Sequence, residues 1–401
     1  MTDYIRVPYG STVHGQKEID AVVKVLNTTT QMSKNVRDLE NKVAALYSKD
    51  FGVMVNSGTS ALYLAIESMA LPQGSEVITP ALTFGTTVAS IIKNNLVPHF
   101  VDVKDNTYCI DETQIEKCIS EKTSAIIAPD LMGNICDWPM ISQIAKKHSL
   151  KILIDSADTL GASLDGTSTG SFADVAITSF YGSHVINGAG NGGMIATSDS
   201  DIAAKCRLLR SWGRSSSLFE DSEAVQNRFN VQLDGIPYDA KFLFSELGYQ
   251  LEPSEISAAF ALVQLEQLED NIKKRNQNFD SHSKFFGKYE DFFELPVQNS
   301  SAHTCWLAYP IKVKENAGFS RTEMQIYLEE RNIQTRVVFT GNVLRQPMMS
   351  GQNFVGKADD FVNADRVMKN GILLACHHGL TDDMKEHLYS TIEEFIETQR
   401  D

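Results

Sequence analysis

The sequence predicts an α/β protein, in which a large domain built on a mostly parallel seven-stranded sheet precedes a smaller α+β domain. Two observations support this prediction. Between residues 76 and 180, short β-branched runs alternate with helical stretches, a pattern typical of parallel strands with helices on both faces. The chain is also long, with 401 residues of which 42% are hydrophobic. It can therefore bury one large core and a second, smaller one.

The predicted elements of the large domain follow in order along the chain. Two helical stripes, residues 16–28 and 36–47, have the pattern of packing helices. A turn at residues 57–60 opens a helix at residues 61–69. The predicted strands are residues 51–55, 76–79, 99–103, 124–128, 151–154, 175–180 and 194–197, and the helices between them are residues 86–93, 111–119 and 140–147.

The smaller domain is expected after a polar, irregular stretch that follows residue 210, of the kind that is usually a functional loop. A long helix over residues 254–286 leads into this domain, so we expect one domain at residues 1–253 and the other at 254–401. Further strands are predicted at residues 306–313 and 335–338, and helices at residues 321–330, 362–369 and 382–397.

Charge and composition exclude several classes of function. The formal net charge is −15, whereas nucleic acids and anionic membranes are bound by clustered Lys and Arg. The sequence has neither a signal-peptide pattern nor an apolar run long enough to span a membrane. Its six cysteines include no Cys-x-x-Cys pair, which favours reduced thiols over disulfides or a zinc site. We therefore expect a cytoplasmic protein without a metal, a nucleic-acid partner or a membrane partner.

Candidate functional residues lie where predicted parallel strands end. Ligands of such sheets bind beyond the carboxyl ends of the strands, and four groups lie there: the turn at residues 57–60, Phe84, Asp155 and the loop around His184. Small residues at a helix start let backbone N–H groups approach an anion. Taken singly, Asp155 could be a helix cap, Phe84 a core aromatic and His184 a structural loop residue.

The loop AITSFYGSHVINGAGNGGM resembles the cofactor-lysine loop of the DegT/DnrJ/EryC1/StrS sugar-aminotransferase family. In that family a Ser-Phe pair precedes the lysine that binds pyridoxal phosphate, and a Gly-Gly pair follows it. Ser179-Phe180 and Gly192-Gly193 match this pattern, but His184 occupies the position of the lysine. An imidazole cannot form a Schiff base, although it exchanges protons near neutral pH. The same replacement marks the nucleotide-sugar 3-dehydratases, whose SFY-x-x-His resembles SFYGSH.

The resemblance covers nearly the whole chain and implies an aspartate-aminotransferase-like fold. It also implies roles for individual residues. Asp155 would pair with the pyridine nitrogen of the cofactor, Phe84 would stack on its ring, and Asp158 would lie near the ring hydroxyl. Phosphate contacts are implied for Gly58, Thr59, Ser60 and Ser179 and, across a subunit interface, for Gln250; substrate contacts are expected from Arg336 and Asn342 in TRVVFTGNVLRQPMM.

The implied reaction is loss of the C3 hydroxyl from a nucleotide-linked 4-keto-6-deoxyhexose, in 3,6-dideoxysugar biosynthesis for O-antigen or lipopolysaccharide. Pyridoxal or pyridoxamine phosphate would be the cofactor, and His184 would act as base and then as acid, with a pKa near the working pH. Iron–sulfur members of this branch have a cysteine cluster where this chain has Ser215, Ser216 and Ser217, and serine is a poor ligand for such clusters. We therefore expect no iron–sulfur cluster, an amino donor such as glutamate, and a homodimer.

Two other functions stay open at this point. A plain aminotransferase would need a displaced lysine, for which Lys205 and Lys241 are the nearest candidates in the sequence. A non-catalytic relative would bind the sugar nucleotide without converting it.

Overall fold

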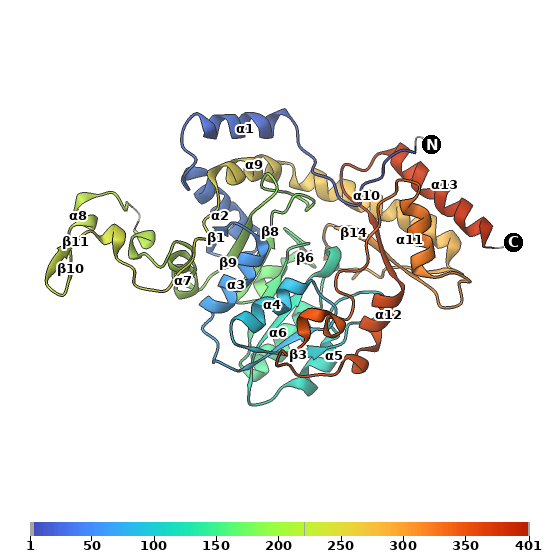
Figure 1. The fold of residues 1–401 in the computed structure, drawn as a ribbon, viewed down its shortest axis with the longest axis horizontal. Helices are drawn as coiled ribbons and strands as arrows, with labels where there is room; N and C mark the ends of the chain where they lie inside the picture. The colour runs from blue at the N-terminus through green and yellow to red at the C-terminus, as the bar shows by residue number, and fades with distance from the viewer. Residues whose placement is uncertain (1–3, 220, 400–401) are drawn as a thin grey trace.

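A seven-stranded sheet forms the centre of the computed structural model, which describes residues 4–219 and 221–399 (Figure 1). The strand order is β1-β9-β8-β5-β4-β2-β3. Six strands of this sheet are parallel, and β9 runs antiparallel to both of its neighbours. This architecture agrees with the predicted fold class. The strands are β1 (Phe51–Val55), β2 (Glu76–Pro80), β3 (Val97–Val101), β4 (Thr123–Pro129), β5 (Lys151–Asp155), β8 (Val175–Ser179) and β9 (Gly193–Thr197).

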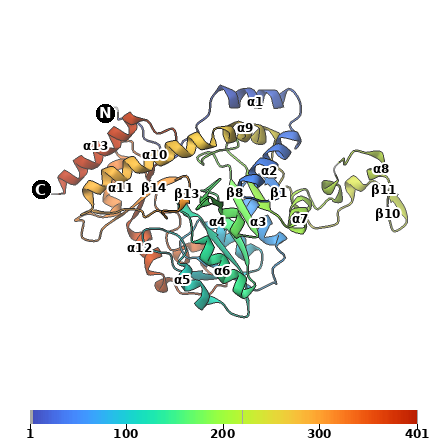
Figure 2. The ribbon, with the colours of Figure 1, turned by 180° about the vertical axis from the view of Figure 1, so that it is seen from behind.

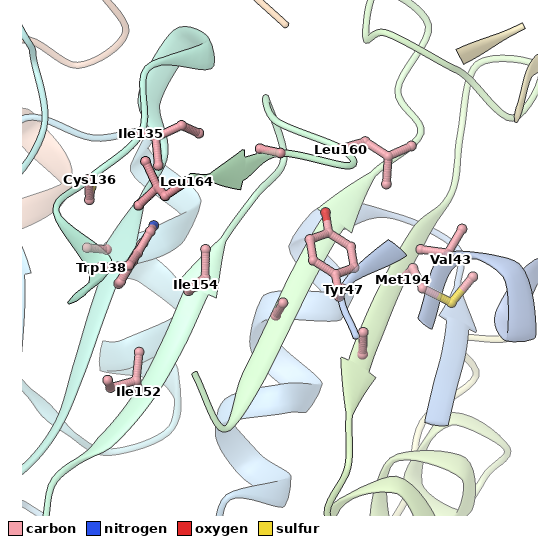
Figure 3. Close-up of a cluster of buried hydrophobic side chains, with 14 of the residues drawn as sticks. Val43, Tyr47, Ile135, Cys136, Trp138, Ile152, Ile154, Leu160, Leu164 and Met194 are labelled. Atoms are coloured by element: carbon pink, nitrogen blue, oxygen red, sulfur yellow. The ribbon is translucent and has the colours of Figure 1, made fainter. Parts of the chain in front are cut away.

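Both faces of the sheet are buried, because successive side chains along each strand point to opposite sides. On one face, Ile152 and Ile154 of β5 join a hydrophobic cluster with Tyr47 and Trp138 (Figure 3). Leu153, between them, belongs to a second cluster. The helices of this part are α1 (Gln16–Leu26), α2 (Lys34–Leu46), α3 (Gly58–Ser68), α4 (Gly85–Lys93), α5 (Glu112–Ile115), α6 (Trp138–His148) and α7 (Ser200–Arg210).

The C-terminal part is organised on a three-stranded antiparallel sheet in the order β12-β14-β15. The strand predicted at residues 335–338 is wrong. Only Arg336 pairs there, in an isolated bridge with Leu373, and the successive exposed residues Arg336 and Val337 break the alternation of a strand. The elements are β12 (Phe293–Glu294), β14 (Ala308–Val313), β15 (Gly371–Ala375), α11 (Arg321–Glu329), α12 (Val362–Asn370) and α13 (Asp382–Thr398).

The long helix predicted over residues 254–286 is in fact two helices, α9 (Glu255–Glu266) and α10 (Leu268–Phe286). The break lies at Gln267, whose N–H donates to the carbonyl of Gln264 in a tighter, 3₁₀-type turn. α9 packs against α1 and α2, and the end of α10 joins the C-terminal hydrophobic cluster. The domain boundary between residues 253 and 254 stays a prediction.

Residues 212–219 and 221–249 form an arm that projects from the body of the molecule beside α7 (Figures 1 and 2). The sequence predicts an irregular loop here, but the structure contains α8 (Val225–Arg228) and a hairpin of β10 (Val231–Leu233) and β11 (Ile236–Tyr238). Asp234 and Gly235 form the turn, with φ of 50° and 82°. An Asp-Gly pair with two positive φ angles is the signature of a two-residue hairpin, so this signal was present in the sequence.

A small additional sheet contains β6 (Ser163–Leu164), β7 (Thr167–Ser168) and β13 (Ala302–His303). Within the described ranges, no helix has the length and apolar character needed to cross a membrane. The same ranges contain no group of three or more His, Cys, Asp or Glu side chains that could hold a metal ion.

Candidate active site

A cavity of about 330 Å³ lies at the carboxyl ends of the parallel strands. This is the edge of an α/β sheet where ligands bind. The cavity is lined mostly by segments at the strand ends of the large sheet, by Tyr9 near the N-terminus, and by Leu307 and Phe339 from the C-terminal part. Seven of the predicted site residues line it: Gly58, Thr59, Phe84, Asp155, Asp158, Ser179 and His184.

His184 lies in the loop between β8 and β9. Its Nδ1–H donates a hydrogen bond of 3.1 Å to the carbonyl oxygen of Ser179. Because a carbonyl only accepts, Nδ1 carries the proton of the neutral ring and Nε2 holds the lone pair. Burial and, to a lesser degree, the charge of Arg275 lower the pKa of His184 to about 4. The expected pKa near neutrality is therefore corrected: the ring is a neutral base at pH 7, and once protonated it is a stronger acid than free imidazolium.

The first turn of α3 approaches the end of β8 very closely. Ser57 caps α3 by accepting a hydrogen bond of 3.1 Å from the N–H of Ser60. A Cβ on Gly58 would lie 2.7 Å from the Cβ of Ser179, and a Cβ on Gly193 would lie 2.3 Å from the carbonyl oxygen of Ser57. The two glycines thus bring the Ser179 hydroxyl beside the N-terminus of α3. The first N–H groups of a helix have no partner within the helix and attract anions.

Two carboxyl groups lie along the cavity, one at the end of β5 and one shortly after it. Asp155 accepts hydrogen bonds from the Thr87 hydroxyl (2.8 Å) and from the Ala157 N–H (3.2 Å), and burial raises its pKa. Asp158 accepts a hydrogen bond of 2.8 Å from the N–H of Met132. Burial raises the pKa of Asp158 to about 7, although this hydrogen bond opposes the shift. A positively charged group on a ligand would lower both pKa values again and favour the ionised carboxylates.

Aromatic side chains form another part of the cavity wall. Phe84 is 54% exposed, and its ring meets Phe339 edge to face at 5.8 Å between centroids. An exposed aromatic face can stack on a flat ring. Sequence reasoning missed Tyr9 and Phe339, because no local pattern shows that these two distant segments reach the cavity.

Two predicted site residues are engaged in local hydrogen bonds. The Ser60 hydroxyl donates to Asn56 Oδ1 at 2.6 Å, and Ser60 is not among the residues that line the cavity. Asn342 is fully buried. Its amide donates to the carbonyl of Ala358 and to the Asp365 carboxylate, while its oxygen accepts from the Leu344 N–H. The amide of Asn342 is thus bonded within the chain, and its expected contact with a substrate stays a prediction.

Two further predicted residues lie outside the cavity. Gln250 is exposed at the base of the arm, where its backbone pairs with Ser211. Arg336 is exposed, and its guanidinium carbon lies 5.5 Å from the ring centre of Tyr9, which lines the cavity. Arg336 is thus next to the cavity wall, whereas Gln250 is not among the described residues that line the cavity.

The residues present fit pyridoxal or pyridoxamine phosphate. Asp155 is a buried carboxyl group for the ring nitrogen, Phe84 offers an exposed face for the ring, and the start of α3 with Ser179 offers donors for the phosphate. Among the described residues that line the cavity there is no lysine or arginine. The phosphate would therefore be held by the neutral donors of this cavity.

Known proteins share the sequence over nearly its whole length. The sequence model of the DegT/DnrJ/EryC1/StrS aminotransferase family matches residues 13–393. The lipopolysaccharide biosynthesis protein RfbH of Salmonella typhimurium is 32% identical, over 97% of this chain and 92% of its own length. The dTDP-4-dehydro-2,6-dideoxy-D-glucose 3-dehydratase of Saccharopolyspora spinosa is also 32% identical, over 97% and 86% of the two chains.

Solved structures share the fold. The E. coli GDP-4-keto-6-deoxy-D-mannose-3-dehydratase with bound hydrated pyridoxal phosphate has a TM-score of 0.85 and 24% identity, over 97% of this chain and 99% of that one. An aminotransferase from Psychrobacter cryohalolentis has a TM-score of 0.87 and 21% identity, over 99% and 100% of the two chains. Because a dehydratase and an aminotransferase superpose equally well, these structures confirm the aspartate-aminotransferase-like fold and leave the reaction open.

Proposed function

Since the chain belongs to the DegT/DnrJ/EryC1/StrS aminotransferase family, whose cofactor is pyridoxal or pyridoxamine phosphate, we propose that it is a 3-dehydratase of nucleotide-linked 4-keto-6-deoxyhexoses. One observation carries this proposal. Where the family resemblance implies the cofactor lysine, the cavity is lined by the neutral imidazole of His184. Relatives named as 3-dehydratases support the same class of reaction.

His184 is the proposed proton carrier. When bound, the cofactor supplies an electron sink that makes a neighbouring C–H bond acidic. The free Nε2 of His184 can take up a proton, because the hydrogen bond from Nδ1 to Ser179 fixes the tautomer. The protonated ring, with its low pKa, is then a ready donor to the departing C3 hydroxyl. One side chain can thus serve as base and acid in sequence.

The remaining residues bind and orient the cofactor and the substrate in this proposal. Asp155 would hold the ring nitrogen, and the N–H groups of Gly58 and Thr59 would hold the phosphate together with the Ser179 hydroxyl. Arg336 is the candidate contact for the phosphates of the nucleotide, because it lies beside Tyr9 at the cavity wall. These roles rest on placement and chemistry and are part of the proposal.

We also propose that turnover uses an amino donor such as glutamate and no iron–sulfur cluster. Where iron–sulfur relatives have cysteines, the Ser217 hydroxyl donates to the Arg214 carbonyl (2.7 Å) and the Ser215 hydroxyl to the Leu243 carbonyl (3.3 Å). Serine hydroxyls compete poorly with thiolates for iron. Iron and acid-labile sulfide would be assayed after anaerobic purification. A stoichiometric cluster on which activity depends would contradict this part of the proposal.

The test of the reaction is incubation with a panel of nucleotide-linked 4-keto-6-deoxyhexoses, pyridoxal phosphate and glutamate, followed by mass spectrometry. A sugar that has lost the C3 oxygen, with oxidation of glutamate to 2-oxoglutarate as the two-electron source and release of its nitrogen as ammonia, supports the dehydratase. An amino sugar that carries the nitrogen of glutamate would establish the aminotransferase instead. Binding without conversion across the panel would establish the non-catalytic relative.

The structure does not favour a displaced lysine. Lys205 forms an ion pair of 2.6 Å with Glu246, and Lys241 pairs with Glu223 in the arm. Neither lysine lines the cavity. Borohydride reduction of the protein loaded with pyridoxal phosphate should therefore leave no cofactor bound to a lysine, as read from the intact protein mass.

A further inference from the structure

Two buried side chains of α10 hold the backbone on either side of His184. Arg275 Nη2 donates to the carbonyl of Ser183 at 3.0 Å, and Asn271 Nδ2 donates to the carbonyl of Val185 at 3.1 Å. Asn271 and Arg275 are four residues apart on one helix, so they lie on the same face of α10. A single helix therefore fixes the carbonyl directly before His184 and the carbonyl directly after it.

Arg275 is an unusual residue for this task. Its side chain is fully buried, at 0% exposure, and its hydrogen bonds within the described part of the chain all go to neutral acceptors. Nη1 donates to the carbonyls of Trp306 (3.0 Å) and Leu307 (3.2 Å), and Nε donates to His378 Nδ1 (3.2 Å). Asp158 interacts with Arg275 electrostatically, but none of the described hydrogen bonds joins the two side chains. Burying a charge without a hydrogen-bonded counter-ion costs several kcal/mol. Neutral donors could bond the same carbonyls at lower cost, so the charge itself calls for an explanation.

We propose that Asn271 and Arg275 are positioning residues for His184, which hold the loop so that the imidazole presents Nε2 to the cavity. This inference rests on the proposed function, in which His184 moves the proton. The hydrogen bond of the ring to Ser179 completes an attachment at three points. Asn271 only holds the loop in position, whereas Arg275 holds the loop in position and also places a fixed positive charge near His184.

The positive charge of Arg275 favours the neutral form of His184. It adds to burial in lowering the pKa of His184, so it keeps the ring in the form that accepts a proton. Other titratable groups surround the same ring and are retained in the variants below, and the charge of Arg275 also lowers the pKa of Asp158, His377 and His378. Tyr9, Asp155, Asp158 and Tyr181 line the cavity with His184, and His377 and His378 lie close to Arg275.

Three variants distinguish the effect of the loop position from the effect of the positive charge of Arg275. Asn271→Ala and Arg275→Lys should lower turnover by about tenfold to a hundredfold, up to the loss that a misplacement of about 1 Å produces. Arg275→Met should lower turnover at least as much. It should also move the acid limb of the pH profile upward by on the order of one pH unit, because one buried charge is removed. Asn271→Ala should leave that limb in place.

The matched control is Lys273→Gln, which removes a positive charge from the exposed face of the same helix. It should change neither turnover nor the pH profile. In a His184→Asn background, Arg275→Lys should have little further effect on turnover, because it acts through a group that is already absent. Full additivity of the two substitutions, or an acid limb that Arg275→Met leaves unmoved, would overturn the proposal.

A measurement without substrate keeps this inference separate from the proposed function. Histidine-selective ¹³C labelling of the full chain, with the His184 signal assigned from its loss in His184→Asn, gives the protonation midpoint of His184 directly. The midpoint should be near 4 in the parent and higher in Arg275→Met. A raised midpoint in a protein that dehydrates no sugar would leave the positioning role intact and reject the dehydratase. An unmoved midpoint in an active dehydratase would reject the role of the charge. If Arg275→Met does not fold, Arg275→Lys and Asn271→Ala still decide the geometric part.

Discussion

At the scale of single residues, the proposed reaction depends on one imidazole whose two nitrogens have different environments. In His184→Asn, the proposed cofactor contacts of Asp155 and Ser179 would be retained, so pyridoxamine phosphate should still bind. Turnover should fall by roughly a hundredfold or more, the usual contribution of a positioned acid–base group. Absorbance titration measures the binding, and mass spectrometry of the sugar measures the rate.

His303→Asn is the matched control, because His303 is exposed and lies outside the cavity. It should leave both quantities unchanged. If His184→Asn dehydrates the sugar at nearly the parental rate, another group must be the base. The candidates are then Tyr181, Ser183, His377 and His378.

A second substitution at the same position should change the reaction. In His184→Lys, the burial that lowers the histidine pKa would also favour a neutral, nucleophilic amine. We expect the lysine to bond covalently to pyridoxal phosphate and to favour amino transfer over loss of water. Borohydride reduction followed by intact mass would detect the link, and the sugar product would reveal the reaction. A variant without the link, or one that still only dehydrates, would show that position 184 does not select the reaction.

The carboxyl group of Asp158 predicts a dependence of stability on pH. Burial raises its pKa from 3.8 to about 7, so folding favours the protonated form. This contribution to stability is fully present at a pH below 3.8, the pKa of Asp158 in the unfolded chain, and it is lost as the pH rises through about 7. At pH 8, cofactor-free Asp158→Asn should therefore be more stable than the parent, by at most about 4 kcal/mol. The difference should shrink as the pH falls toward 4, and denaturant unfolding across this range would detect it. A constant difference would exclude the titration of Asp158 as the cause.

At the scale of elements, the close approach of α3 and β9 makes a sharp prediction. In Gly193→Ala, the new Cβ would meet the Ser57 carbonyl, a backbone atom that cannot swing aside. We expect a loss of about 1 to 3 kcal/mol in unfolding free energy, the usual range for overpacking. Affinity for the cofactor phosphate should weaken too, because the first turn of α3 is displaced.

Gly287→Ala is the control for this substitution. No heavy atom lies within 4 Å of the Cβ that would be added at Gly287, so its unfolding free energy should stay close to that of the parent. Equal effects of the two substitutions would mean that the contact at Gly193 is not the cause.

Most of the large sheet could be predicted, because its strands are apolar runs bounded by turn signals. β1 has the predicted bounds, and β5 and β8 differ from the prediction by one residue. The cavity was predicted only in part. The strand-end residues Phe84, Asp155 and His184 follow from the alternation of strands and helices and from the family motif. Tyr9, Arg275 and Phe339 could not be identified, since they reach the site through tertiary packing that no local period encodes. β15 and the Asp234-Gly235 turn, by contrast, had signals in the sequence that the prediction overlooked.

At the scale of the whole molecule, the arm leaves many large apolar side chains exposed to solvent. Exposed apolar side chains gathered on one segment are typical of an interaction site. We predict a homodimer in which a second copy of the chain covers the arm, in agreement with the cross-subunit role that the family resemblance implies for Gln250. The exposed apolar residues of the arm are Trp212, Leu218, Phe219, Val225, Phe229, Leu233, Ile236, Tyr238, Phe242, Phe244 and Leu247.

The double substitution Ile236→Asp and Leu247→Asp tests this dimer. Both side chains are exposed, at 63% and 94%, so the charges cost little in a monomer and a great deal in an apolar interface. Sedimentation velocity should show dissociation of the dimer. Ile326→Asp, at an exposed position on α11, should leave it intact. A parent protein that sediments as a fully active monomer at low concentration would rule out the shared site.

The reversed direction of β9 has a consequence for how such a protein can acquire new chemistry. Because β8 and β9 are antiparallel neighbours, Ser179 lies directly opposite Gly193, and the segment between them leaves the sheet and returns to it at adjacent points. This segment can therefore be exchanged without altering the order of the strands. Asn271 and Arg275 bind this segment through hydrogen bonds to backbone carbonyls, which every amino acid carries. A different loop of the same length would therefore be held in the same way. A new reaction would then require only a new loop between β8 and β9, while the sheet and α10 stay unchanged.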